Sequence, residues 1–161
     1  MNMVQNVLII CIGNICRSPM AAALFLEKTN KRSLPVSISS AGLGALVNKE
    51  ADPHSRALMS DRGLSIHDHR ARQVTAEIIY SADIIFTMDT EQHMVVEKQY
   101  PAAHGRVHRL GEWGGYNIAD PYLRPKSAFE HSLLLIEQGV QDWYEKLWGE
   151  KQEAAIHKGI A

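Results

Sequence analysis

The sequence predicts an α/β protein built on a parallel sheet with helices on both faces. Residues 7–10 form a short, almost wholly apolar run, which is typical of a strand buried on both sides. Along the chain, such strand patterns alternate with helical patterns, and this alternation is typical of parallel sheets. The 161 residues suffice for one domain, and no repeat, low-complexity tract or linker divides them, so we predict a single domain over 1–161.

The first strand leads through a short loop into a predicted helix over 18–31. Ser18 is a favoured N-cap, and Pro19 suits the first helical position because its missing N–H would be unpaired there anyway. Further strands are predicted over 36–39, 83–88 and 107–110, which makes four in all.

The remaining helices are predicted between these strands and after the last one. A helix begins at Pro53 with Asp52 as its N-cap and stops at Gly63, and others cover 75–81 and 90–99. The last helix starts with a capping box, Ser127 to Glu130. One face of it is apolar and is expected to pack in the core: Phe129, Leu133, Ile136, Val140, Trp143 and Leu147. The polar residues 150–161 are predicted to fray.

Composition narrows the class of protein. A net charge of −1 argues against nucleic-acid binding. No apolar run approaches the roughly 18 residues needed to span a membrane, and the first residues lack the basic region of a signal peptide. Two cysteines, one of them a candidate nucleophile, suggest a reducing compartment, so we expect a cytoplasmic location.

The loop from Cys11 to Arg17 has the features of an anion site with a nucleophile. A turn from a strand into a helix N-terminus gathers backbone N–H groups, and the helix dipole adds positive potential. Gly13 and Asn14 tolerate the positive φ that such a loop requires, and Arg17 adds a planar fork of donors. This environment favours the thiolate form of Cys11, and phosphoryl transfer to its sulfur is the expected reaction.

Three other interpretations of this loop compete with a catalytic one. A cysteine at the end of a buried strand is often an inert apolar residue. The pair of cysteines provides too few ligands for a zinc site, and no Gly-Lys-Ser/Thr sequence closes a nucleotide-binding loop.

Residues 11–19, CIGNICRSP, closely resemble the signature of the low-molecular-weight protein-tyrosine phosphatases. The resemblance extends from Val4 to about Leu147. It implies four parallel strands with the phosphate loop after the first, and hydrolysis of phosphotyrosine through a phosphocysteine, with no metal or other cofactor. The phosphate would be held by the Arg17 guanidinium and by the backbone amides of Ile12, Gly13, Asn14, Ile15, Cys16 and Arg17.

A general acid is needed to protonate the leaving tyrosine oxygen. Asp52 is better explained as a helix cap. Asp89 is better explained as a residue that braces Arg17 or caps the helix that begins at Thr90. Asp120 lies in a long irregular loop, which suits function. The resembling family carries its acid in an Asp-Pro-Tyr motif that Asp120, Pro121 and Tyr122 match, so the resemblance assigns the acid to Asp120.

Supporting residues are expected around the loop. Ser18 can donate a hydrogen bond to the sulfur of Cys11. Asn14 holds a strained conformation only if its amide is tied down. The resemblance implies that Ser40 and His69 help to do this.

Apolar and aromatic residues near the loop could flank the phenyl ring of a substrate, although ordinary loop packing explains them equally well. The candidates are Leu43, Leu46, Trp113, Tyr116 and Tyr122. The chain has leucine, at Leu43 or Leu46 and at Leu123, where animal members often have aromatic residues. With these leucines and with Glu130-His131 in its last helix, it resembles bacterial members linked to exopolysaccharide export. That resemblance implies a tyrosine autokinase as the partner.

Cys16 is either a packing residue or a redox partner that pairs with Cys11 under peroxide and protects the thiolate. Two rival functions also remain. An arsenate reductase shares this fold and loop, but the usual cysteine relay outside the loop is absent from the sequence. A non-catalytic phosphotyrosine-binding module would need a dead nucleophile or a missing acid, yet Cys11, Arg17 and Asp120 are all present.

Overall fold

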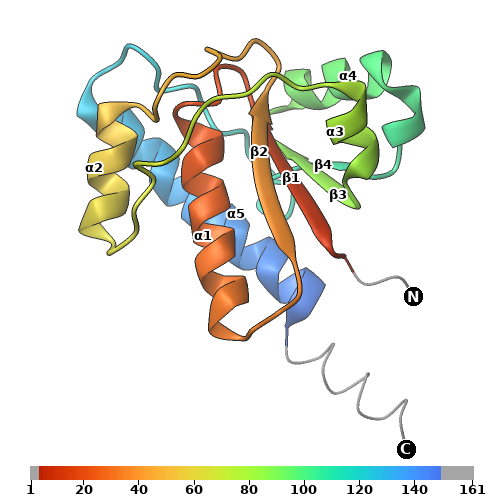
Figure 1. The fold of residues 1–161 in the computed structure, drawn as a ribbon, viewed down its shortest axis with the longest axis horizontal. Helices are drawn as coiled ribbons and strands as arrows, with labels where there is room; N and C mark the ends of the chain where they lie inside the picture. The colour runs from red at the N-terminus through yellow and green to blue at the C-terminus, as the bar shows by residue number, and fades with distance from the viewer. Residues whose placement is uncertain (1–3, 150–161) are drawn as a thin grey trace, which may run out of the picture.

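The computed structural model describes residues 4–149, and its centre is a parallel sheet (Figure 1). The strands are β1 (Asn6–Cys11), β2 (Ser37–Gly42), β3 (Ile84–Thr87) and β4 (Val107–Arg109). They form a four-stranded sheet in the order β2-β1-β3-β4, with every pairing parallel. The predicted sheet is confirmed. Because β1 has β2 on one side and β3 on the other, its carboxyl end opens at a reversal of strand order, where open α/β sheets form their sites.

Helices cover both faces of the sheet. On one face lie α1 (Arg17–Lys31), α2 (Pro53–Asp61) and α5 (Lys126–Trp148), with α1 packed along α5. On the other face lie α3 (Ala76–Ser81) and α4 (Thr90–Gln99), followed by a 3-10 turn, Pro101–Ala103. The predicted two-sided covering is therefore confirmed.

The side chains of β1 alternate between two apolar cores. Val7, Ile9 and Cys11 join the core beneath α1 and α5, whereas Leu8 and Ile10 join the core beneath α3 and α4. Because its side chains are buried on both faces of the sheet, the strand has an almost wholly apolar sequence. In the larger core the ring of Phe25 stacks on that of Phe86, with 5.4 Å between ring centroids.

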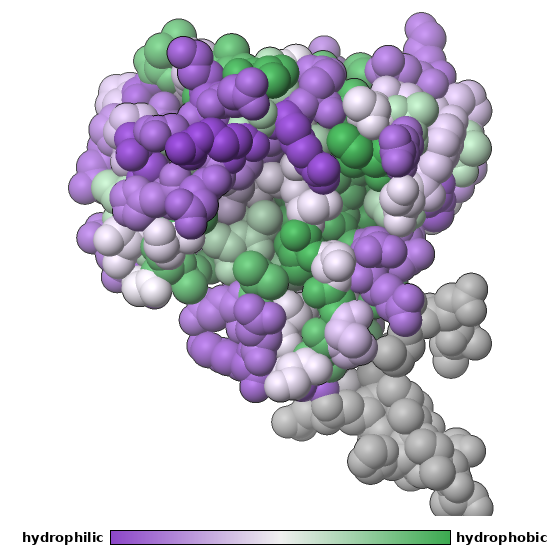
Figure 2. All heavy atoms as spheres, in the orientation of Figure 1, coloured by the Kyte–Doolittle hydropathy of each residue, from purple (hydrophilic) through white to green (hydrophobic). Residues whose placement is uncertain are grey.

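The apolar face of α5 is buried as predicted, except at its end. Its residues Phe129, Leu133, Ile136, Val140 and Trp143 are buried in the larger core, and Leu147 is half-buried against it. Figure 2 shows that hydrophilic residues cover much of the face drawn in Figure 1 and that apolar residues gather in its middle.

Of the three helix caps predicted from the sequence, two are wrong and one is confirmed. Helix α1 begins at Arg17 with Cys16 as N-cap and no side-chain cap, because the Ser18 hydroxyl contacts the preceding loop instead. Helix α5 begins at Lys126 after Pro125, also without a side-chain cap, so the Ser127–Glu130 capping box does not form. Asp52 does cap α2, accepting the His54 N–H at 2.9 Å.

The other boundaries agree with the sequence patterns to within about one residue, except that β2, predicted over 36–39, continues to Gly42, because it pairs with β1 along its whole length. Gly63 follows α2 with φ +75°, the left-handed conformation expected of a helix stop. Within residues 4–149, no helix combines the length and apolarity that crossing a membrane requires. The predicted frayed tail, 150–161, lies outside the described residues.

Candidate active site

The loop between β1 and α1 coils around the carboxyl end of β1. Asn14 lies at its centre with φ +58°, a left-handed conformation that asparagine tolerates better than most residues. Gly42, at the end of β2, lies close against the loop. A Cβ on Gly42 would come within 2.3 Å of the Ile12 carbonyl oxygen, so only glycine allows this approach.

Asn14 is fully buried, and its amide joins three parts of the chain. Its Nδ2 donates to the hydroxyls of Ser18 at 2.8 Å and Ser40 at 2.9 Å, and its Oδ1 accepts the Arg72 N–H at 3.0 Å. Both amide hydrogens and the amide oxygen of Asn14 therefore take part in hydrogen bonds. This network ties the strained residue to α1, β2 and the segment before α3.

The Ser18 hydroxyl lies 2.9 Å from the Cys11 sulfur, and both groups are buried. Because Ser18 Oγ accepts a hydrogen bond from Asn14, its own proton can be directed to the sulfur. A thiolate can only accept, so the chain Asn14 to Ser18 to Cys11 is arranged to stabilise negative charge on sulfur.

His69 lies on the other side of Asn14. Its Nε2 is 2.6 Å from the Asn14 carbonyl oxygen. A carbonyl oxygen accepts only, so Nε2 carries the proton. Burial lowers the pKa of His69 below its ordinary value of 6.5, opposed by this hydrogen bond and reinforced by the nearby charge of Arg70. His69 therefore fixes the loop as a neutral donor at neutral pH.

The guanidinium of Arg17 is buried, with 2% of its side chain exposed, and carboxylates lie nearby. Its Nη1 donates to the Ile118 carbonyl at 2.8 Å and lies 4.0 Å from Asp89 Oδ2, while its Nη2 lies 3.5 Å from Asp120 Oδ2. Its Nε has no hydrogen-bond partner within the described part of the chain. A buried donor without a partner is costly, and an oxyanion bound here would provide an acceptor.

Asp89 both faces Arg17 and caps α4, the two roles that the sequence suggested for it. Besides facing Arg17, its Oδ1 accepts the Gln92 N–H at 2.8 Å and caps α4. Asp120 is more open, with 46% of its side chain exposed, and its Oδ1 accepts the Tyr122 N–H at 3.1 Å. One oxygen of Asp120 is thus fixed by its own turn, and the other faces Arg17.

Cys11, Arg17 and Asp120 line one cavity of about 190 Å³. The rest of its wall comes from the loop and from two other segments: Ile12, Gly13, Ile15, Cys16, Gly44, Leu46 and Tyr122. Leu46 and Tyr122, two of the predicted wall residues, therefore line the cavity that holds Cys11. Leu43 lines an adjoining hollow instead.

Two predicted wall residues lie elsewhere, and we correct them. Trp113 packs against Trp143, with 5.4 Å between ring centroids, and beneath the Lys146 ammonium. Tyr116 donates its hydroxyl to the Leu135 carbonyl of α5 at 2.8 Å. Both rings hold the loop before Asp120 onto α5, so the alternative of ordinary packing is correct for them.

Cys16 is buried and faces the same cavity. Burial raises the pKa of its thiol well above the ordinary range, and the negative charge of Asp52 adds to this effect. Cys16 is accordingly a thiol at neutral pH. Two further contributors to the site, the Ile118 carbonyl and the Arg72 amide, could not be predicted from the sequence, because backbone groups carry no side-chain signal.

Residues 6–153 match the sequence profile of the low molecular weight phosphotyrosine protein phosphatases. The chain belongs to this family. A probable phosphatase named EpsP from Ralstonia nicotianae is 44% identical over 146 residues, covering 90% of this chain and 97% of its own. The Wzb phosphatase of Salmonella typhimurium is 36% identical, covering 92% and 98%.

Solved structures of family members share the fold. The Erwinia amylovora phosphatase AmsI superimposes with a TM-score of 0.85 at 34% identity, covering 91% of this chain and 95% of its own. The Escherichia coli phosphatase Wzb in complex with sulphate gives 0.84 at 32% identity, covering 90% and 99%. An arginine phosphatase named YwlE from Geobacillus stearothermophilus gives 0.82 at 29%, covering 92% and 96%.

Proposed function

We propose that this protein hydrolyses phosphotyrosine in proteins through a phosphocysteine intermediate. The observation that carries the proposal is the meeting of a nucleophile, a buried guanidinium and a carboxyl group at one cavity, formed by Cys11, Arg17 and Asp120. The helix α1 begins at this cavity, so its N-terminal amides and dipole favour an anion there.

In the first step the Cys11 thiolate attacks phosphorus in line with the leaving oxygen. A sulfur–phosphorus bond forms as the phosphorus–oxygen bond breaks. The amides of residues 12–17 and the Arg17 guanidinium bind the equatorial oxygens. Asp120, protonated at the start, gives its proton to the tyrosine oxygen, and tyrosine leaves as the neutral phenol.

In the second step Asp120, now a carboxylate, takes a proton from a water molecule as that water attacks phosphorus. The sulfur–phosphorus bond breaks, and inorganic phosphate and the Cys11 thiolate are released. The Ser18 hydroxyl, 2.9 Å from the sulfur, stabilises the departing thiolate. The step therefore regenerates both Cys11 and the protonated form of Asp120.

The shape of the cavity supports an aryl substrate. Ile12, Leu46 and Tyr122 line the same cavity as Cys11, and their apolar surface would contact a phenyl ring bound there. A phosphoserine side chain is shorter and offers little apolar area, so we infer a strong preference for phosphotyrosine.

The physiological partner that we propose is a bacterial tyrosine autokinase of exopolysaccharide production, met in the cytoplasm. The relatives named EpsP, Wzb and AmsI support this proposal, because the chain is similar to each of these phosphatases over 90% or more of its length. Neither rival function is favoured by the comparisons, since these matches are named tyrosine phosphatases.

The test is phosphate release from a tyrosine-phosphorylated peptide, its phosphoserine counterpart and a phosphoarginine peptide, with Cys11→Ser as control. We expect release from the first peptide alone and none from the variant. Arsenate with a small-molecule thiol is assayed in parallel. Equal release by wild type and Cys11→Ser, or faster turnover of arsenate than of phosphotyrosine, would refute the proposed function.

A further inference from the structure

A second hollow of about 350 Å³ adjoins the catalytic cavity. The two share Ile12, Arg17, Gly44 and Asp120, so they form one continuous surface. The far side of this hollow is made by Leu43 and by the start of α4. We call it the α4 groove, and its remaining lining residues are Asp89, Glu91, Gln92 and Val95.

The α4 groove is acidic. Asp89, Glu91 and Asp120 line it, whereas Arg17 is the sole basic residue among its lining residues. Because Asp120 is protonated when the substrate binds, the negative charge that faces the substrate comes from Asp89 and Glu91. The guanidinium of Arg17 is already flanked by Asp89 and Asp120. A phosphate bound in the catalytic cavity would engage Arg17 further. The groove beside it therefore attracts a positive charge.

The α4 groove also offers a polar contact and an apolar surface to a bound chain. Gln92 is 2% exposed, its Oε1 accepts the Met88 N–H at 2.9 Å, and its Nε2 has no acceptor among residues 4–149. A peptide carbonyl in the groove would supply that acceptor. Ile12 and Val95, each 42% exposed, would contact the methylene stem of a long side chain.

We infer that the α4 groove binds the substrate residues that flank phosphotyrosine and selects a lysine or arginine among them. This inference rests on the proposed function and adds a substrate preference to it. The phosphate and the basic side chain would occupy neighbouring sites of opposite charge. An acidic residue at the same position would face Asp89 and Glu91 and would be disfavoured.

The test uses phosphotyrosine peptides with an alanine background. Lysine or glutamate replaces alanine at each of three positions before and after the phosphotyrosine, and kcat/KM is measured at low and high salt. At one or more positions we expect the lysine peptide to exceed the glutamate peptide by about fivefold, with a smaller ratio at high salt. Glu91→Gln should bring that ratio down to about twofold.

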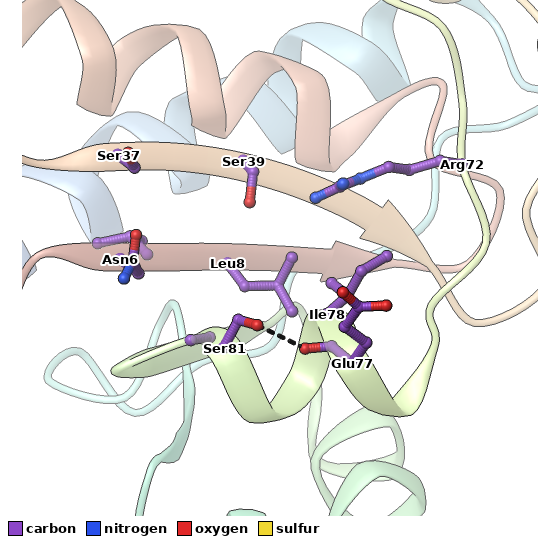
Figure 3. Close-up of a pocket in the computed structure, with 10 residues that line it drawn as sticks. Asn6, Leu8, Ser37, Ser39, Arg72, Glu77, Ile78 and Ser81 are labelled. Carbon is purple, nitrogen blue, oxygen red and sulfur yellow. Dashed lines mark hydrogen bonds between the residues drawn. The ribbon is translucent and has the colours of Figure 1, made fainter.

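Glu77 provides a matched control. Like Glu91 it lies in the first turn of a helix, here α3, so both substitutions remove the same favourable interaction with a helix N-terminus. Glu77 lines a separate hollow with Arg72 and Ser39, as Figure 3 shows. Glu77→Gln should keep the full lysine preference and the wild-type rate on phenyl phosphate.

The outcomes separate this inference from the proposed function. If phosphotyrosine peptides are hydrolysed but lysine and glutamate give equal rates everywhere, the inference is overturned and the phosphatase activity stands. The inference is also overturned if the ratio of lysine to glutamate rates is unchanged in Glu91→Gln, or if Glu77→Gln lowers that ratio as much as Glu91→Gln does. If neither peptides nor phenyl phosphate are hydrolysed faster than by Cys11→Ser, both the proposed function and this inference fail.

Discussion

Asn14 is the residue whose replacement gives the sharpest test of the loop. Asn14→Ala removes three side-chain hydrogen bonds at a fully buried position, those with Ser18, Ser40 and Arg72. It also places alanine at φ +58°, where a Cβ is unfavourable. Stability and catalysis should both suffer, because the amide orders the loop and orients the Ser18 hydroxyl.

Asn48 allows the two effects of Asn14→Ala to be separated. It has φ +67°, is exposed, and its side chain makes no hydrogen bond within the described part of the chain. Asn48→Ala should therefore cost only the left-handed conformation, about 1–2 kcal/mol. Asn14→Ala should cost this and three hydrogen bonds of about 0.5–1.5 kcal/mol each, hence about 1.5–4.5 kcal/mol more.

The assays are urea unfolding of both variants and kcat/KM on an aryl phosphate. Asn14→Ala should also lower kcat at least about tenfold, whereas Asn48→Ala should retain wild-type kinetics. Equal losses of unfolding free energy in the two variants would refute the reasoning, because the buried hydrogen bonds would then contribute nothing. An unchanged kcat in Asn14→Ala would show that the amide does not orient Ser18.

Four further predictions concern single residues of the site. Asp120→Asn should lower kcat/KM about 10²–10⁴-fold for phosphotyrosine but far less for an ester of a very acidic phenol, and equal losses on both would remove Asp120 from the acid role. Ser18→Ala should slow breakdown of the phosphocysteine about tenfold or more, seen as a larger burst of phenol release, and an unchanged burst would contradict the donor role. Cys16→Ser should keep turnover but lose recovery by reductant after peroxide. Because burial raises the pKa of the Cys16 thiol, recovery of the wild type should improve when oxidation is done at higher pH, and recovery by Cys16→Ser equal to wild type would count against a disulfide with Cys11. The lowered pKa of His69 means that the folded protein binds fewer protons than the unfolded chain, so unfolding free energy should fall as pH drops below 6.5, and His69→Gln should flatten this dependence. Identical pH profiles for the two proteins would show that His69 is not the group responsible.

Two of the predictions that failed, those for Ser18 and Trp113, share one cause, the competition between local and distant partners. Ser18 followed by Pro19 is a good local N-cap signal, yet Asn14 and Cys11 take up its hydroxyl. The aromatic residues before Asp120 had the composition of a substrate wall. Whether Trp113 faces a cavity or α5 depends on where the loop crosses the helix, and residue type does not encode that.

The sequence by itself determined the succession of strands and helices along the chain, the burial of β1 on both of its sides and the anion loop that follows β1. These features depend on hydrophobic period and on residues within about ten positions of each other, so local patterns specify them. Only the tertiary structure decided the contacts of Arg17 with the Ile118 carbonyl and Asp120, and of Asn14 with Ser40 and Arg72. Those partners lie 26 to 103 positions away along the chain, and chain folding alone brings them to the same edge of the sheet.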